Sequence, residues 1–173
     1  MNKLVSLLVV SLLLLFSCNQ KTQEKLQTEE AMITYNKNAK IVHALFDALE
    51  DEDLEAIATF FEEEVKFNPP AFGGKVANKQ EVLESYNRFL KIMNNIKAND
   101  RDFYPTVDSK FVPDGGVRIY TTWTADIAGK PIGFEGIKAY EVFKFSENNK
   151  IIEVDEYMDM TGMINKINEL ITE

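Results

Sequence analysis

The chain has 173 residues, of which 45% are hydrophobic and 27% are charged, so it has the length and composition of one globular domain and not of a disordered or fibrous chain. Its 28 acidic residues outnumber its 19 basic residues, and the formal charge of -9 removes the electrostatic basis for non-specific nucleic-acid binding. One cysteine and one histidine exclude an intramolecular disulfide, a cysteine-based zinc site and a metal centre built from several histidines.

The N-terminus is typical of an exported protein. Lys3 is followed by an apolar run over residues 4–16, which is too short to cross a bilayer as a permanent helix. A basic residue, a short apolar stretch and a small residue together predict a secretory signal peptide. The sequence Leu-Phe-Ser-Cys, ending at Cys18, resembles the bacterial lipobox, in which the cysteine is lipidated and becomes the mature N-terminus. An ordinary signal peptide with a chance cysteine is the alternative.

We therefore expect residues 1–17 to be a lipoprotein signal peptide, residues 18–28 a flexible polar tether and residues 29–173 the folded domain. Acyl chains on Cys18 would hold the protein on a membrane, since each buried methylene contributes about 0.8 kcal/mol. Asn19 is not the aspartate that favours inner-membrane retention in enterobacterial lipoproteins. The expected location is the bacterial cell envelope, at the outer membrane where the cell has two membranes.

The first half of the domain has helical periodicity. A helix is predicted to begin near Thr28, and Asp53 is expected to cap a second, short helix. A brief strand over residues 65–68 is stopped by two prolines, and a loop over residues 71–74 follows. Asn78, with a glutamate three residues later, has the pattern of a capping box and predicts a third helix.

From Asp102 onward the apolar period is two, which predicts strands. The expected strands cover residues 102–107, 117–127, 132–145 and 151–160. The expected turns lie at residues 113–116, 129–131 and 148–149. A terminal helix is expected after Gly162. Helices followed by a long antiparallel sheet define the α+β class.

This order of elements resembles the nuclear transport factor 2-like superfamily, and within it the SnoaL-like domains. The match covers about residues 35–165, and the residues that carry it are Phe46-Asp47-Ala48-Leu49, Asp53-Leu54 with Ile57, Phe60-Phe61-Glu62-Glu63-Glu64-Val65, Phe143-Lys144-Phe145, Asn149-Lys150-Ile151-Ile152 and Tyr157-Met158-Asp159. The resemblance implies a cone-shaped fold in which N-terminal helices pack on a strongly curved antiparallel sheet. Ketosteroid isomerases, limonene epoxide hydrolases, polyketide cyclases, dehydratases and non-enzymatic binding modules share this fold, so the resemblance implies a pocket and no single reaction.

Two glutamates fall among apolar residues on the inward face of the last two predicted strands. A two-residue turn at Asn148-Asn149 sets a register that pairs Phe145 with Ile152 and Glu141 with Glu156. Directly opposite residues have Cβ atoms about 4.5–5.5 Å apart. Two ionised carboxylates would repel there, so we expect a shared proton and one strongly raised pKa, which suits acid and base chemistry. A structural network, or a register shifted by one β-bulge, is the alternative.

The resemblance gives both glutamates counterparts. Glu141 matches the acid that donates to the oxyanion in ketosteroid isomerases, and Glu156 matches an active-site aspartate of limonene epoxide hydrolases. The isomerase tyrosine, however, falls at Leu45 and its base at Pro69 or Asn68, and the arginine of the hydrolases has no inward counterpart. The resemblance therefore does not extend to steroid isomerase or epoxide hydrolase activity.

Three hypotheses of function follow. The first is a lipid-anchored domain that binds a small apolar molecule, with catalysis left open. The expected pocket residues are Trp123, Phe143, Met158, Phe72, Asn68 and Thr121, with Glu141 and Glu156 as candidate catalytic groups. The second is a lyase or isomerase, like a polyketide cyclase or dehydratase, that moves a proton next to a carbonyl. The third is a dimerising module with Tyr120, Tyr140 and Tyr157 on an exposed sheet face. We expect no cofactor, metal or nucleic-acid partner.

A few polar residues have structural explanations beside functional ones. His43 is expected on the solvated side of its helix. Tyr86 could direct its hydroxyl into the pocket, although core packing is the default for a tyrosine on an apolar stripe. Asp155 and Asp159 could form an oxygen cluster for calcium, but no loop geometry supports one. Asp159 also matches an aspartate frequent in SnoaL-like domains, where it ties the strand to the final helix.

Overall fold

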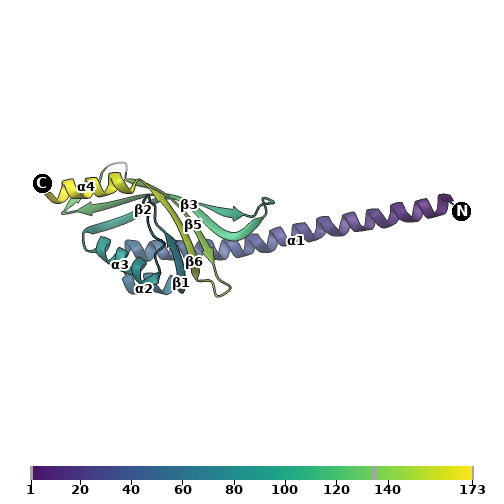
Figure 1. Cartoon of the computed structure of the whole chain (residues 1–173), viewed down its shortest axis with the longest axis horizontal. Coiled ribbons are helices and arrows are strands. Elements are labelled where there is room, and N and C mark those ends of the chain that lie inside the picture. The colour runs from purple at the N-terminus through teal and green to yellow at the C-terminus, as the bar shows by residue number, and fades with distance from the viewer. Residues whose placement is uncertain (1, 134–135, 173) are drawn as a thin grey trace.

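The computed structural model describes residues 2–133 and 136–172, with side chains from residue 25 onward. Its elements are α1 (Asn2–Glu50), α2 (Leu54–Phe60), β1 (Phe61–Asn68), α3 (Lys79–Leu90), β2 (Met93–Val107), β3 (Pro113–Ile127), β4 (Lys130–Pro131), β5 (Ile137–Phe145), β6 (Ile151–Met158) and α4 (Met160–Thr172). The helices α1, α2 and α3 lie along one side of a curved sheet (Figure 1). The predicted α+β class and cone-shaped fold are confirmed.

The sheet is mixed and not purely antiparallel as expected. Its strand order is β1-β6-β5-β3-β2, and β4 pairs with β3 outside this path. β1 runs parallel to β6, whereas the other pairs are antiparallel. The parallel pair arises because the long path through α3, β2, β3 and β5 returns β6 to the side of β1.

α1 is much longer than predicted. It begins at Asn2 and not near Thr28, and it runs through residues 18–28, the expected tether. Residues 2–50 contain no glycine or proline and are rich in leucine, lysine, glutamine and glutamate, which favour helix. The side chain of Cys18 lies outside the described side chains, so its lipidation stays a prediction. Over the described part of the chain, no helix combines the length and hydropathy needed to cross a membrane.

The C-terminal half of α1 fixes the core against the sheet. Its inward stripe is the predicted one and is buried: Val42, Leu45, Phe46 and Leu49. Arg101 of β2 donates to Asp47 at 2.6 Å and to Glu50 at 2.5 Å. Earlier in the helix, the Asn38 side-chain amide donates to the Gly115 carbonyl at 2.8 Å. These polar contacts set the angle at which the helix crosses β2 and β3.

Both predicted helix caps are present. The side chain of Asp53 accepts a hydrogen bond from the Ala56 N–H at 2.9 Å and starts α2. Asn78 and Glu81 form a full capping box at the start of α3. β1 begins at Phe61 and not at residue 65, because the register shifts between Phe61 and Lys66 and disturbs the alternation along the acidic run.

Several strand boundaries differ from the predicted ones. β2 begins at Met93, because register shifts with Asn95 and Asp100 at positive φ break its alternation of apolar and polar residues. The turn expected at residues 113–116 lies inside β3, and the chain reverses at residues 108–112. There the Asp108 carboxylate accepts hydrogen bonds from two backbone N–H groups, at 2.7 and 3.0 Å.

The third predicted strand and the last helix also differ. β5 begins at Ile137 and not at residue 132, since Gly136 adopts a φ of 64°, outside the range of an extended strand. α4 begins at Met160, before Gly162, because Asp159 accepts a hydrogen bond from the Gly162 N–H at 2.8 Å. Asp159 thus ties β6 to α4.

The β5–β6 hairpin reaches the predicted pairing of the two glutamates through two local departures. Its loop has three residues and not two, since the Ser146 N–H donates to the Lys150 carbonyl at 2.8 Å. Phe145 therefore pairs with Ile151 and not with Ile152. A β-bulge that skips Ile152 then restores the predicted register, and Glu141 pairs with Glu156.

The bulge makes a testable prediction, because it exchanges the roles of two neighbouring isoleucines. Ile151 is 0% exposed, whereas Ile152, which the two-residue turn would have turned inward, is 37% exposed. We expect Ile151→Ala to lower the free energy of unfolding by about 2–5 kcal/mol and Ile152→Ala by less than about 1 kcal/mol. Urea denaturation of both variants measures the difference, and equal losses would contradict the bulge.

Candidate functional site

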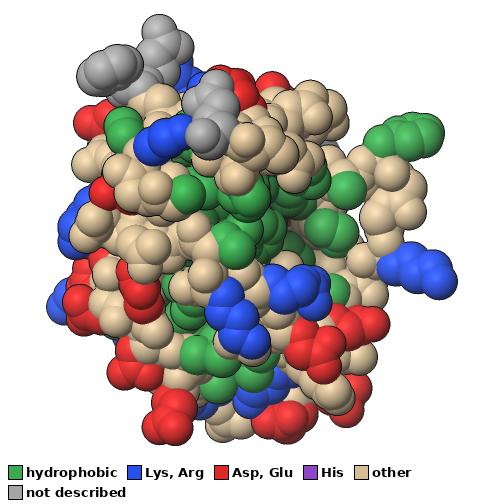
Figure 2. Space-filling view, turned by 90° about the vertical axis from the view of Figure 1, so that its left-hand side faces the viewer, with side chains coloured by type: hydrophobic (Ala, Val, Ile, Leu, Met, Phe, Trp, Pro, Cys, Tyr) green, Lys and Arg blue, Asp and Glu red, His purple; other side chains and the backbone are tan. Residues whose placement is uncertain are grey.

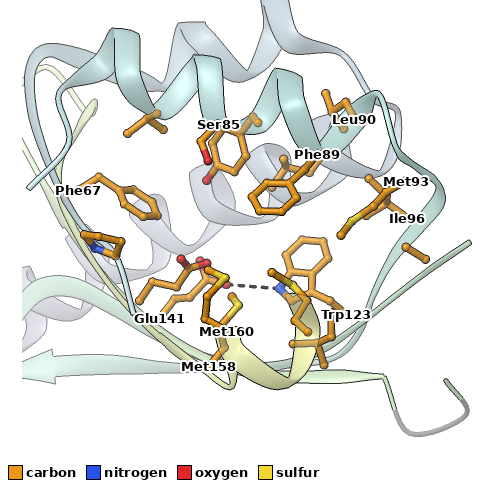
Figure 3. Close-up of a pocket in the computed structure, with 18 of the residues that line it drawn as sticks. Phe67, Ser85, Phe89, Leu90, Met93, Ile96, Trp123, Glu141, Met158 and Met160 are labelled. Carbon is orange, nitrogen blue, oxygen red and sulfur yellow. Dashed lines mark hydrogen bonds between the residues drawn. The ribbon is translucent and has the colours of Figure 1, made fainter. Parts of the chain in front are cut away.

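A cavity of about 210 Å³ lies between α3 and the inner face of the sheet (Figure 3). Pockets for drug-sized ligands typically measure about 300–1,000 Å³, so this cavity suits a smaller molecule. At the end of the molecule that carries α3 and α4, hydrophobic side chains gather in a hollow ringed by polar and charged groups (Figure 2). The pocket that the resemblance implies is therefore present at this end of the molecule.

The cavity wall is mostly apolar and comes from both layers of the fold. α3 contributes its inward stripe, and the sheet contributes residues that alternate with solvent-facing neighbours. The principal lining residues are Val82, Ser85, Tyr86, Phe89 and Leu90 from α3, Trp123, Ala125, Ile137, Glu141, Glu156 and Met158 from the sheet, and Phe67 and Met163 from β1 and α4. Binding there would remove an apolar ligand surface from water.

Glu141 is a buried acid at the floor of the cavity. Its exposed fraction is 5%, and it follows Ala139 and precedes Phe143 on the inward face of β5. The indole Nε1–H of Trp123 donates to its Oε1 at 3.4 Å, the contact drawn dashed in Figure 3. This long hydrogen bond satisfies only part of the capacity of a carboxylate, which can accept about four.

Glu156 lies directly opposite Glu141 on β6 and lines the same cavity. The pairing expected from strand parity is therefore present in the structure. Desolvation by burial, and then the charge of Glu156, raise the pKa of Glu141 to about 8. Burial also raises the pKa of Glu156 to about 7. The pair therefore retains a proton near neutral pH, while its catalytic role stays a prediction.

Tyr86 brings a third acidic group to the pair. The sequence predicted core packing as the default for this tyrosine. It lines the cavity, and its pKa is raised well above the ordinary value, first by burial and then by the charges of Glu156 and Glu141. Its hydroxyl is thus close enough to both glutamates to respond to them. The apolar stripe of α3 indicates that Tyr86 faces inward, but the position of the hydroxyl depends on the tertiary packing.

Two of the six predicted pocket residues, Trp123 and Met158, line the cavity. Phe143 and Thr121 are on the buried face of the sheet, but neither lines the cavity. Phe143 packs against Phe46 with ring centroids 6.3 Å apart. Thr121 is buried and donates to the Asn99 carbonyl at 2.7 Å. Strand parity identifies the inward face but not which part of it a helix fills.

The other two predicted pocket residues are also outside the cavity lining. Phe72 is fully exposed, because it sits in the loop that follows the two prolines at the end of β1. Asn68 donates from its side chain to the Asp155 carboxylate at 2.7 Å, next to the parallel β1–β6 pairing. Asp155 is thus held by an amide. Within the described residues there is no group of three His, Cys, Asp or Glu side chains placed to hold a metal ion.

The opposite face of the sheet carries a row of tyrosines. Tyr120, Tyr140 and Tyr157 lie there as expected, and Tyr104 extends the row onto β2. Successive ring centroids are 6.1, 4.7 and 5.6 Å apart. His43 is likewise outside the cavity and stacks on Phe103 at 4.0 Å. Dimerisation through the tyrosine row stays a prediction.

The chain was compared with known families and structures. A family model described as a SnoaL-like domain matches residues 42–154. PrhC from Penicillium brasilianum NBRC 6234 is 19% identical with a TM-score of 0.63, covering 80% of this chain and 91% of that chain. A putative SnoaL-like polyketide cyclase from Shewanella denitrificans OS-217 is 14% identical with a TM-score of 0.60, covering 76% of this chain and 97% of that chain.

A third similar structure, a putative isomerase from Bacillus subtilis, is 12% identical with a TM-score of 0.64, and the match covers 79% of this chain and 96% of that chain. At these identities, the likeness to all three structures shows a shared fold. The comparison with curated proteins gave no match.

The buried glutamates predict a specific pH dependence of stability. Because the pKa of each is raised above 4.5 in the folded protein, the folded state binds more protons than the unfolded state between pH 4.5 and about pH 8. The free energy of unfolding should therefore fall as pH rises through this window. Each unit of pKa shift corresponds to about 1.4 kcal/mol. Between pH 5 and pH 8.5 we therefore expect the free energy of unfolding to fall by at least about 1.4 kcal/mol less in a Glu141→Gln, Glu156→Gln double variant than in wild type.

Urea denaturation at pH 5 and pH 8.5 measures this difference. Glu64→Gln, at an exposed position of β1, is the matched control and should keep the wild-type pH dependence. Parallel pH profiles of wild type and double variant would show that the two carboxyl groups ionise normally.

Proposed function

Because the chain belongs to the SnoaL-like family, we propose that it is a lipid-anchored domain whose cavity binds a small, largely apolar molecule. The observation that supports this proposal is the apolar cavity of about 210 Å³ with Glu141, Glu156 and Tyr86 gathered at one place in its wall. Apolar walls with a few converging polar groups are the usual composition of a ligand pocket. The walls supply affinity, and the polar groups orient the ligand.

The long α1 supports the proposed anchoring at Cys18. Met32 already packs against the hydrophobic core, so the domain begins about 14 residues after the cysteine. As a helix with a rise of 1.5 Å per residue, this segment spans about 21 Å. Figure 1 shows the helix projecting from the folded domain on the side away from α3 and α4. In the proposed arrangement, the helix holds the cavity clear of the membrane surface.

If the cavity binds a ligand, a bulky side chain that fills the cavity should abolish the binding. Ser85 lines the cavity from α3, whereas its neighbour Glu84 is exposed (Figure 3). We expect Ser85→Phe to remove a small-molecule adduct that native mass spectrometry detects on the protein purified without its lipid. Glu84→Phe adds the same ring to the same helix outside the cavity and should keep the adduct. If neither wild type nor the control carries a ligand, binding in the cavity is not supported.

A second candidate is a lyase or isomerase that moves a proton next to a carbonyl. The observation that favours it is the pairing of two buried carboxyl groups across β5 and β6, each with a raised pKa. Glu141, the more buried of the two, would donate its proton to the carbonyl oxygen. Glu156 would take a proton from the adjacent carbon. The ketone and the enol then differ only in the position of one proton.

This chemistry predicts a bell-shaped dependence of kcat/KM on pH for a small ketone that enters the cavity. The base must be ionised and the acid protonated at the same time, so activity should be highest near neutral pH, where the pair holds one proton. Glu141→Gln and Glu156→Gln should each lower kcat/KM by about 100-fold or more. Proton exchange at the carbon next to the ketone, followed by NMR, measures the rate, and unchanged exchange in either variant would exclude the mechanism.

A further inference from the structure

The cavity has negative charge and no positive side chain to balance it. Glu81, Glu141 and Glu156 line it, and no lysine, arginine or histidine does so among the residues that the structure describes. Arg101, which lies over the ring of Phe46 at 5.6 Å, is already paired with Asp47 and Glu50. The glutamates therefore lack an internal counter-ion.

The rest of the wall suits a cation with an apolar surface. Phe67, Tyr86, Phe89 and Trp123 present aromatic rings to the cavity. The face of an aromatic ring attracts a cation, most strongly where water is excluded. An inorganic cation would lose its water shell against carbon and gain few oxygen ligands, because the structure gives no metal-binding cluster over the described residues.

We propose that the ligand of this cavity is an organic ammonium, a single positive charge carried on a small apolar body. This inference rests on the proposed function, since it presumes that the cavity binds a small molecule. The charge would lie beside Glu141 and Glu156, and the apolar body would lie against Trp123 and the rings and methionines of the wall. One cation balances one of the two negative charges that the pair carries when both carboxyl groups are ionised.

Proton linkage distinguishes this ligand from a neutral carbonyl compound. Tyr86 from α3 is the titratable group that faces the pair, whereas Glu81 lines the cavity from the capping box at the exposed start of α3. The lining residues from β1, β3 and α4 carry no charge. A cation favours the ionised pair, so its binding releases protons and tightens as pH rises. A carbonyl oxygen needs a protonated carboxyl as donor, so its binding tightens as pH falls. The two ligand classes thus have opposite pH dependence.

The experiment uses two probes of the same shape, benzyltrimethylammonium and its neutral isostere neopentylbenzene. The quaternary ammonium keeps its charge at every pH, so only the protein titrates. Trp123 is the single tryptophan of the chain and lines the cavity, so its fluorescence reports binding at this site. We expect the Kd of the cation to fall at least tenfold from pH 6 to pH 8.5, because the release of one proton changes the Kd by up to about tenfold per pH unit. The Kd of neopentylbenzene should change less than twofold.

The matched variants separate charge from shape. We expect a Glu141→Gln, Glu156→Gln double variant to bind the cation at least tenfold more weakly at pH 8.5 and neopentylbenzene as wild type does. Glu84→Gln, on the exposed side of α3, should change neither affinity.

Two results would overturn the inference. Binding of neopentylbenzene without binding of the cation at pH 8.5 excludes an ammonium ligand but leaves a ligand-binding cavity. Equal affinity of wild type and double variant for the cation excludes the glutamates as its counter-ions. Binding of neither probe contradicts the proposed function as well.

Discussion

The pairing of Glu141 with Glu156 across β5 and β6 is the constraint on which the site depends. Two carboxyl groups in apolar surroundings destabilise a fold, because ionised groups lose hydration there. The surrounding structure offsets this cost by burying a large apolar core against the same sheet, with Phe46 and Phe143 among its fully buried side chains. A pair retained at such a cost is more readily explained by a ligand than by stability.

The site is held by the core behind it. Arg101 is fixed by Asp47 and Glu50, and its guanidinium lies over the ring of Phe46. The Phe46 ring packs against Trp123 with centroids 4.8 Å apart, and Trp123 donates to Glu141. α1 and β2 thus orient the indole that contacts the buried acid. Such support from packed neighbours is what keeps a polar group in a defined position inside an apolar cavity.

The local rules of the sequence predicted some features of this fold well, and others depended on tertiary structure. The caps at Asp53 and Asn78 follow from side chains that bond to the nearby backbone, so no distant residue is needed to predict them. The start of β2 was missed, since Asn95 and Asp100 adopt positive φ and break the alternation that marks a strand. These bulges depend on how β2 pairs with β3, which periodicity does not report.

The glutamate pair was predicted for a reason that is only partly correct. Parity placed Glu141 and Glu156 inward, but the assumed two-residue turn is a three-residue loop, and the bulge at Ile152 compensates for it. The longer loop shifts the register by one residue, and the bulge shifts it back by one residue. The two shifts cancel, so the side chains of Glu141 and Glu156 stay on the same face. The position of the Tyr86 hydroxyl beside the pair had no sequence signal beyond an inward stripe.

The number of protons on the pair decides between the chemistries that this cavity allows. Acid–base catalysis needs one proton retained between Glu141 and Glu156, so that one carboxyl donates while the other accepts. An ammonium bound beside the pair favours the form without that proton, because a positive charge lowers the pKa of a neighbouring carboxyl. A cationic ligand therefore removes the acid on which the proton transfer depends. In the two proposals the same two side chains either hold an ammonium or catalyse enolisation of a neutral ketone, and the charge of the ligand would select between these two outcomes.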